Sequence, residues 1–121
     1  MKKQDILENQ VSYVYLALGS NLGNKIQNLE FAKYELLKKD IKIIKASSYY
    51  RSKSWPDTKF PEFVNCVLFV QTKLILPELF KIIKLIEKSI GRKKTLRNYP
   101  RVCDIDIIDF NGQCLSTGFK F

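Results

Sequence analysis

The order of apolar patterns along the chain constrains its fold more than any other feature of the sequence. β-branched and aromatic residues dominate or alternate in four runs, at positions 12–20, 41–51, 63–73 and 102–110, as expected of strands. Apolar residues recur every three or four positions over 25–38 and 77–90, the spacing of amphipathic helices. An Asn111-Gly112 turn favours a closing hairpin. This β-α-β-β-α-β order predicts an α+β, ferredoxin-like domain of the split β-α-β type with a mainly antiparallel sheet.

Local signals set the expected ends of these elements. Asp40 closes the first helix, Pro77 takes the first position of the second helix, and Gly91 ends it. The segment 52–61 contains two prolines and little periodicity, which indicates a functional loop between the second and third strands.

Length and composition favour one globular domain. The 121 residues are 45% hydrophobic and 27% charged, close to the average for folded domains. We expect a single domain over residues 1–121, with 1–11 as a short N-terminal extension. Because no apolar run approaches the roughly 18 residues of a membrane span, and the N-terminus lacks a signal-peptide core, we expect a cytoplasmic protein without a membrane partner. A monomer is also expected.

The titratable residues exclude several kinds of chemistry. The chain has no histidine and three cysteines, so Ser-His-Asp and Cys-His catalysis and the usual zinc sites are excluded. Cys66, Cys103 and Cys114 lack paired spacing and are expected to be reduced and mostly buried. A net charge of +9 favours an anionic partner, either a phosphate compound or a nucleic acid.

Asp104 and Asp106 are the first candidates for chemistry. They lie two residues apart in a predicted strand, so their side chains emerge on one face. Two close carboxylates repel unless a cation joins them. Mg²⁺ fits, because it takes one or two protein carboxylates and fills its shell with water and phosphates. From these residues alone, two solvated acids on an exposed strand explain the pattern equally well.

A basic segment precedes the two aspartates. It contains no acid and five cations: Arg92, Lys93, Lys94, Arg97 and Arg101. Cations next to a carboxylate pair suit a metal-bound triphosphate, because arginine forks neutralise oxygens that the metal does not reach. A solvated charge run and direct nucleic-acid binding are the alternatives.

Two further signals are weak by themselves. The Gly19 to Gly23 loop joins a strand to a helix, where backbone N–H groups can approach a ligand, but its spacing is also that of an ordinary turn. Phe63 and Asn65 share a strand face and could stack on and hydrogen-bond a flat heterocycle. A core phenylalanine is the commoner explanation of such a residue.

Together these motifs resemble a known family. From about Tyr13 onward, the sequence resembles 6-hydroxymethyl-7,8-dihydropterin pyrophosphokinase of folate biosynthesis. The resemblance rests on Leu18-Gly-Ser-Asn-Leu-Gly23, Ser48-Tyr-Tyr-Arg51, Phe63-Val-Asn65 and Pro100-Arg-Val-Cys-Asp-Ile-Asp-Ile107. It implies a ferredoxin-like enzyme that transfers the pyrophosphoryl group of ATP to the pterin hydroxymethyl and releases AMP. Two Mg²⁺ ions, ATP as co-substrate and a pterin as small-molecule partner follow from the same resemblance.

The resemblance also implies roles for individual residues. Asp104 and Asp106 match the metal ligands, and Arg92 and Arg101 match catalytic arginines on the triphosphate. The remaining implied residues are nucleotide contacts at Lys84, Glu87, Lys94 and Ile107, and pterin contacts at Ser52, Trp55, Phe63 and Asn65.

Two departures from the family pattern define the alternatives. The chain has Arg97-Asn98-Tyr99-Pro100-Arg101 where Arg-Trp-Gly-Pro-Arg is usual, and it ends at Phe121, where the family continues with another arginine and a second aromatic. We therefore expect a C-terminally shortened member. The first alternative is a relative that binds Mg-ATP with little or no catalysis. The second is a basic, ferredoxin-like RNA-binding module, which ranks last because no aromatic-rich central strand is evident in the sequence, so no nucleic-acid partner is expected.

Overall fold

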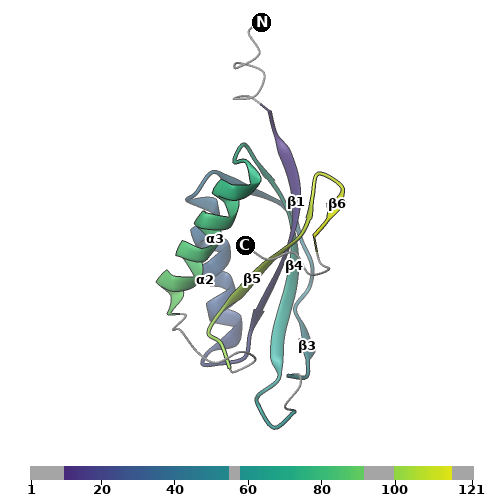
Figure 1. Cartoon of the computed structure of the whole chain (residues 1–121). Coiled ribbons are helices and arrows are strands. Elements are labelled where there is room, and N and C mark those ends of the chain that lie inside the picture. Colours follow the sequence, from purple (N-terminus) through teal and green to yellow (C-terminus); the bar gives the residue numbers. More distant parts are fainter. Residues whose placement is uncertain (1–9, 55–57, 92–99, 116–121) are drawn as a thin grey trace, which may run out of the picture.

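The structure, a computed structural model, describes residues 10–54, 58–91 and 100–115 of the chain. The elements in chain order are β1 (Ser12–Ser20), α2 (Lys25–Leu37), β2 (Ile41–Ala46), β3 (Tyr50–Ser52), β4 (Phe63–Thr72), α3 (Leu76–Ile90), β5 (Asp104–Phe110) and β6 (Gln113–Cys114). Figure 1 shows both helices against one face of the sheet, which leaves its other face without a helical layer among the described residues. Of the expected N-terminal extension, 1–9 lie outside the described residues.

The sheet confirms the predicted ferredoxin-like architecture. Its strand order is β2-β4-β1-β5-β6, with β3 paired to β4, and every pairing is antiparallel. β1 is central, with β4 on one side and β5 on the other. The two strands that follow the helices, β2 and β5, therefore lie on opposite sides of the β1–β4 pair.

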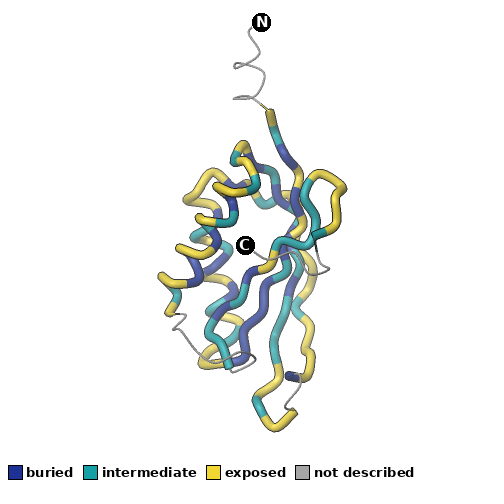
Figure 2. Tube along the Cα trace, in the orientation of Figure 1, coloured by how far each residue is buried: buried dark blue, intermediate teal, exposed yellow. Residues whose placement is uncertain are grey.

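The core lies between the helices and one face of the sheet. Alternate β1 residues, Val14, Leu16 and Leu18, are buried there, and the residues between them face the other side. Figure 2 shows the buried segments along the inner sides of the helices and the central strands. Each fully buried leucine contributes about 1.5–3 kcal/mol, so this alternation orients β1.

The helix ends follow from capping chemistry. The Asn24 side chain accepts a hydrogen bond from the Gln27 N–H at 3.2 Å, an N-cap for α2. Gly91 ends α3 in the left-handed conformation, at φ 114°, as predicted. α3 begins at Leu76, one residue earlier than predicted, because a proline is tolerated throughout the first turn, where its missing N–H has no partner.

The predicted second strand, 41–51, is wrong as a continuous element. The structure divides it into β2 and β3, with a break at residues 47–49. At the break, Ser47 donates its N–H to Val67 O at 2.9 Å and accepts from Val67 N–H through Oγ at 2.8 Å. The serine hydroxyl thus takes the place of a backbone carbonyl. The last long strand also begins at Asp104, not at the predicted position 102.

The cysteines and the helices agree with the sequence analysis. Cys66 and Cys103 are buried, Cys114 is exposed, and none of the three forms a disulfide. Burial raises the pKa of the Cys66 thiol, which keeps it protonated. Within the described ranges, no helix has the length and apolarity required to cross a membrane.

Tyr49 connects the strand break to helix α2. Its hydroxyl donates a hydrogen bond to the Glu30 carboxylate, and Lys33 Nζ lies 4.5 Å from the centre of the Tyr49 ring. Lys33 also forms an ion pair with Glu30 at 3.0 Å. These three side chains hold the break against the helix.

We predict that Tyr49→Phe lowers the free energy of unfolding by at most about 1 kcal/mol near neutral pH, because the lost hydrogen bond joins partly exposed groups. The hydrogen bond from Tyr49, followed by that from Lys33, lowers the pKa of Glu30. The contribution is therefore complete above the unfolded-state pKa of Glu30 and disappears as the pH falls through the lower folded-state pKa. Urea unfolding over a descending pH series measures this. Tyr50→Phe is the control, and a difference that persists in acid would contradict the assignment.

Candidate functional site

The strand register gathers the candidate residues at one end of the open sheet face. Gly19 of β1 is paired with Asn65 of β4 on one side and with Asp104 of β5 on the other. Directly paired residues of antiparallel strands project from the same face. In the next row on this face, Ala17 lies between Val67 and Asp106. Gly19 and Ala17 of β1 thus separate a side that contains the Asn65 amide from an acidic side that contains Asp104 and Asp106.

Gly19 allows the β4 side chains to approach β1 closely. A Cβ atom at position 19 would lie 3.0 Å from Asn65 Oδ1 and 3.2 Å from Cδ1 of the Phe63 ring. Both contacts are tighter than ordinary van der Waals separations. A side chain at position 19 would therefore force the Asn65 and Phe63 side chains to shift.

Three of the four predicted pterin contacts come together. Asn65 Nδ2 donates to Ser52 Oγ at 2.9 Å and to Tyr50 O at 3.3 Å. Ser52 is paired with Phe63 across β3 and β4. Ser52, Phe63 and Asn65 thus form one group, which we call the amide–aromatic group. The fourth residue, Trp55, lies outside the described residues.

The acidic side consists of Asp104 and Asp106. Ile105 between them is 2% exposed and faces the helices, so both carboxylates are on the open face. Arg101 Nη1 lies 3.9 Å from Asp104 Oδ1, and this cation offsets part of the repulsion between the acids.

The chemistry of this acidic pair fits magnesium. The part of the chain that the structure describes holds no cluster of three or more His, Cys, Asp or Glu side chains suited to a metal. A cation at Asp104 and Asp106 would need further oxygen ligands, which water or a bound anion can supply. Mg²⁺ is usually bound in this way, with few protein carboxylates and several non-protein oxygens.

Glu87 has a position that the sequence did not indicate. It is 1% exposed and lies on the helix side of β5, where its Oε2 accepts a hydrogen bond from the Ile105 N–H at 2.8 Å. Lys84 Nζ lies 3.2 Å from its Oε1. Glu87 therefore holds the backbone of β5 between the two aspartates, from the opposite face.

The predicted nucleotide contacts are not all brought together. Lys84 and Glu87 are on α3, and Ile107 packs against the core, so these three lie on the helix side of β5. Arg101 approaches the acidic pair. Arg92 and Lys94, with most of the basic segment, lie outside the described residues.

Comparison with known proteins decides the family. The model of the 7,8-dihydro-6-hydroxymethylpterin-pyrophosphokinase family matches residues 15–117, which include both sides of the site. The chain belongs to this family.

Named relatives of this pyrophosphokinase family support the assignment. The chain is 39% identical over 104 residues to the 2-amino-4-hydroxy-6-hydroxymethyldihydropteridine pyrophosphokinase of Aquifex aeolicus, which covers 86% of the chain and 64% of the relative. It is 35% identical over 103 residues to the same-named protein of Methylorubrum extorquens, covering 84% and 65%. It is also 44% identical over 104 residues to the folic acid synthesis protein FOL1 of Dictyostelium discoideum, covering 86% and 16%. The matched part is thus under two thirds of each of these relatives.

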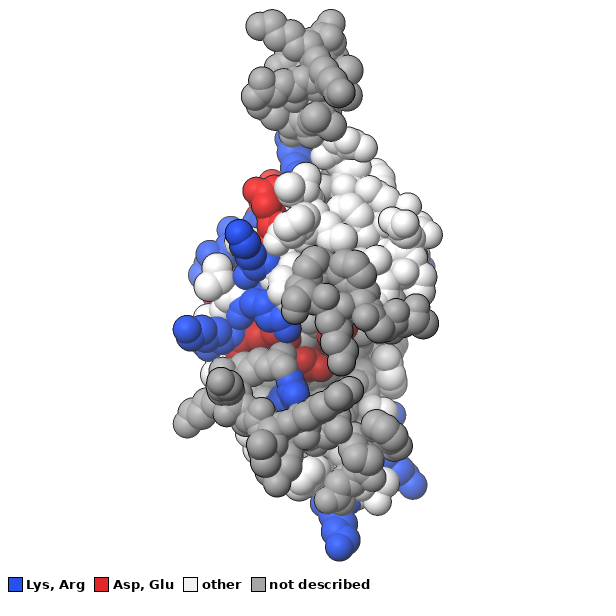
Figure 3. All heavy atoms as spheres, viewed as in Figure 1, with Lys and Arg blue, Asp and Glu red and all other residues white. Residues whose placement is uncertain are grey.

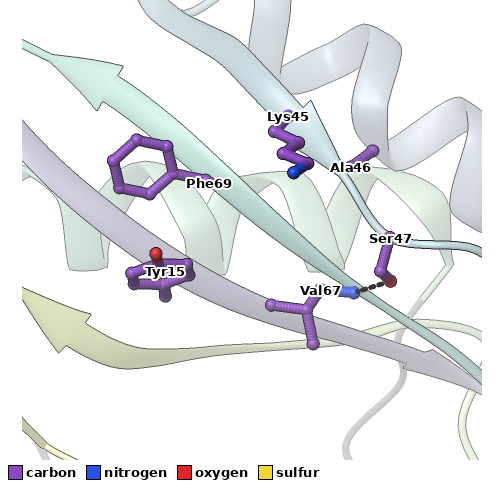
Figure 4. Close-up of a pocket in the computed structure, with 6 residues that line it drawn as sticks. All are labelled: Tyr15, Lys45, Ala46, Ser47, Val67 and Phe69. Carbon is purple, nitrogen blue, oxygen red and sulfur yellow. Dashed lines mark hydrogen bonds between the residues drawn. The ribbon is translucent and has the colours of Figure 1, made fainter.

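An aromatic cluster that the sequence analysis did not single out lies on the same sheet face as the candidate site. Tyr13 and Phe69 stack with ring centres 5.7 Å apart, and Tyr15 lies 4.7 Å from Phe69. An open hollow of about 280 Å³ adjoins them and is lined by Tyr15, Lys45, Ala46, Ser47, Val67 and Phe69 (Figure 4). The signal was present as alternate aromatics in β1, but their common face became evident only with the register. The hollow lies on the same sheet face as the acidic pair, nearer to the Tyr13 end of β1 than Asp104 is.

The charged side chains are also unevenly distributed over the surface. In the space-filling view, Lys and Arg atoms project on the helix side, acidic atoms lie among them, and a broad uncharged area lies on the other side (Figure 3). The net charge of +9 is therefore not spread evenly over this face.

We predict that Glu87→Ala lowers the free energy of unfolding by about 2–4 kcal/mol, because it removes the acceptor of a buried N–H and leaves a cavity. Glu87→Gln should cost less, since it retains an acceptor and nearly the same volume. Urea unfolding measures both values. Lys88→Ala, an exposed substitution next to it on α3, should cost within about 0.5 kcal/mol. If Glu87→Ala costs no more than this control, Glu87 does not hold β5.

Proposed function

We propose that this chain transfers the pyrophosphoryl group of ATP to the hydroxymethyl group of 6-hydroxymethyl-7,8-dihydropterin and releases AMP. The observation that supports this most is the row Asn65–Gly19–Asp104, in which an amide suited to a flat polar ring lies near a carboxylate suited to a metal-bound phosphate. The names of the Aquifex and Methylorubrum relatives describe this chemistry.

The amide–aromatic group would bind the pterin. The Phe63 ring offers a stacking surface worth about 0.5–1.5 kcal/mol beyond its buried area. Asn65 is held by Ser52 and the Tyr50 carbonyl, so its Oδ1 is oriented toward the space above Gly19. Trp55 is proposed as a further pterin contact on the resemblance of its sequence position.

The acidic pair and the cations would bind Mg-ATP. Asp104 and Asp106 would hold the Mg²⁺, and two ions are proposed for the pair. When bound, the metal would neutralise phosphate charge and orient the triphosphate oxygens. Arg101, with Arg92 and Lys94 from the basic segment, would neutralise oxygens that the metal does not reach. The residues on the helix side of β5 would act indirectly, by holding the strand that carries Asp104 and Asp106; they are Glu87, Lys84 and Ile107.

The proposed reaction is one in-line displacement. The pterin hydroxyl oxygen forms a bond to the β-phosphorus, the bond from that phosphorus to the oxygen bridging it to the α-phosphate breaks, and AMP leaves. The hydroxyl proton goes to solvent. The chain contributes by holding the two ligands at adjacent positions and by neutralising charge, which are the main terms in phosphoryl transfer. No covalent intermediate with the protein is required.

We also propose that the chain acts as a monomer in the cytoplasm. Its three cysteines form no disulfide, and two of them are buried, which suits a reducing compartment. Sedimentation of the purified chain tests the oligomeric state.

RNA binding is the second candidate, because the aromatic cluster offers stacking surfaces on two central strands. It is less well supported, since Asp104 and Asp106 project from the same sheet face and would repel a phosphate backbone. The metal that would relieve this repulsion also favours a nucleotide. Titration with labelled single-stranded RNA, in competition with Mg-ATP, separates the two functions.

The decisive test is AMP release from Mg-ATP with the dihydropterin as acceptor. We predict that Asp104→Asn and Asp106→Asn each lower the rate about a hundredfold or more, because several kcal/mol of charge stabilisation are lost. Asp109→Asn, at the third acid of β5, is the matched control and should retain activity.

Mg-ATP binding without AMP release in the unmodified chain would favour the binding-only relative. Calorimetry that shows unchanged Mg-ATP affinity in both variants would remove the metal assignment.

We predict that Arg101→Ala weakens ATP binding by about 1.5–3 kcal/mol, the scale of a charge-assisted contact, and weakens AMP binding less. An arginine fork on the transferred phosphates has no partner in AMP. Arg101→Lys should recover only part of the affinity, because lysine lacks the bidentate fork. Calorimetry with both nucleotides measures this, with Lys42→Ala at the other end of the sheet as control. Equal losses for ATP and AMP would place Arg101 away from the transferred phosphates.

A further inference from the structure

Asn21 is a buried polar residue directly after β1. It is 2% exposed and lies in the Gly19 to Gly23 loop, which the sequence analysis left open as a ligand contact or an ordinary turn. A buried amide side chain needs partners for one carbonyl oxygen and two N–H groups, because each unpaired group costs free energy. The partners of Asn21 come from two separate parts of the chain.

The first partner is the backbone of Arg101. Asn21 Oδ1 accepts from the Arg101 N–H at 2.7 Å, and the Asn21 N–H donates to Arg101 O at 3.1 Å. Both backbone groups of Arg101 are therefore held by one residue. Arg101 is also the residue whose side chain lies 3.9 Å from Asp104. Asn21 thus positions the acidic and cationic side of the site.

The second set of partners lies in the connection between β3 and β4. Asn21 Nδ2 donates to Ser54 Oγ at 3.0 Å and to Pro61 O at 3.2 Å, and Ser54 Oγ donates to the same Pro61 O at 2.6 Å. Ser54 follows β3 by two residues, and Pro61 precedes Phe63 by two residues. These bonds position the amide–aromatic side.

The orientation of the Asn21 amide is set by its partners. The Arg101 N–H can only donate, so it requires the carbonyl oxygen, and the Pro61 carbonyl can only accept, so it requires the NH₂ group. A flipped amide would lose both bonds. The oxygen of the Asn21 amide therefore bonds to the acidic side of the site, and its nitrogen bonds to the amide–aromatic side.

We propose that Asn21 is a positioning residue that couples the two sides, so that a bound phosphate ligand favours binding of the ring ligand, and the reverse. This inference rests on the proposed function. A ligand that orders Arg101 also orders the amide, and the amide then holds Ser54 and Pro61 in place for the second ligand. The second ligand then binds to residues that the first has already ordered, so it loses less conformational entropy. The two affinities are therefore mutually dependent.

Two substitutions separate the sides. Asn21→Asp retains an oxygen for the Arg101 N–H and replaces the NH₂ group with an oxygen that faces the Pro61 carbonyl. It therefore removes the donor to Pro61 O and keeps the bond from Arg101, while the Ser54 hydroxyl can turn and donate to the new oxygen. Ser54→Ala removes one partner from the same side and is the milder variant, for use if Asn21→Asp does not fold.

Lys25→Ala is the matched control. Lys25 Nζ donates to Glu62 O at 2.7 Å, so it holds the same connection between β3 and β4. It has no bond to Arg101 among the described contacts. A general loosening of this connection should affect the control and the test variants alike, whereas loss of coupling should affect only the Asn21 and Ser54 variants.

The experiment measures the dissociation constant of the dihydropterin with and without a saturating non-hydrolysable Mg-ATP analogue. In the unmodified chain we expect the nucleotide to tighten pterin binding about fivefold or more, the usual scale of coupling between two sites. In Asn21→Asp the ratio should fall to about one, while affinity for the nucleotide alone stays within about twofold. In Ser54→Ala the ratio should fall part of the way, and in Lys25→Ala it should be retained. In AMP release, KM for the pterin should rise in Asn21→Asp at saturating Mg-ATP.

The outcomes distinguish this inference from the proposed function. If both ligands bind and AMP is released, but Asn21→Asp or Ser54→Ala retains the full coupling ratio, the inference is overturned and the proposed function is not. A ratio of about one in the unmodified chain also overturns it. If the unmodified chain binds neither ligand, the proposed function is wrong and the inference falls with it. A drop in thermal stability with unchanged coupling would show that Asn21 has a structural role only.

Discussion

The pairing of β1 with a strand on either side is the constraint on which the rest of the structure depends. Its alternation places Val14, Leu16 and Leu18 in the core, and its pairing with β5 then decides which β5 residues share each face. A slip of one residue in β5 would turn Ile105 outward and both neighbouring aspartates into the core. Burying two carboxylates without partners costs several kcal/mol each. The hydrophobic alternation of β1 and β5 therefore also specifies where the acids project.

The acidic pair depends equally on the opposite face of β5. β6 is paired only with Asp109 and Phe110, so the part of β5 that carries the aspartates has β1 as its only strand neighbour among the described elements. At Ile105, Glu87 takes the place of a further strand by accepting the backbone N–H. A buried carboxylate is costly, and Lys84 and this hydrogen bond offset the cost. The position of the open face is thus determined partly by a residue that does not project from it.

Much of the fold was predictable because it follows from local patterns. Periodicity, a capping glycine at position 91 and the Asn111-Gly112 turn predicted every long element, and the spacing of Asp104 and Asp106 predicted their common face. The break at residues 47–49 was missed because the Ser47 bonds to Val67 join strands twenty residues apart, and no local pattern signals them.

For the site as well, local patterns identified residues but could not predict the contacts between strands. Phe63 and Asn65 were identifiable from alternation within one strand. Their contact with Gly19 was not, because it depends on the register between β1 and β4. Glu87 was expected near the nucleotide from resemblance alone, and its burial became evident only from the packing of α3 on β5. Asn21 bonds to Arg101, eighty positions away in the sequence, and no local spacing pattern can predict such a contact.

The arrangement around Asp104 and Asp106 also limits how charge can change when a ligand binds. Before binding, the Arg101 guanidinium at 3.9 Å offsets part of the repulsion between the acids. On the proposed function, Asp104 and Asp106 would hold a metal that neutralises their charge, and Arg101 would then be able to turn to the phosphate oxygens. Arg101 would thus exchange a carboxylate partner for a phosphate partner. This exchange requires the arginine backbone to stay in place while its side chain turns, and the two bonds from Asn21 hold that backbone.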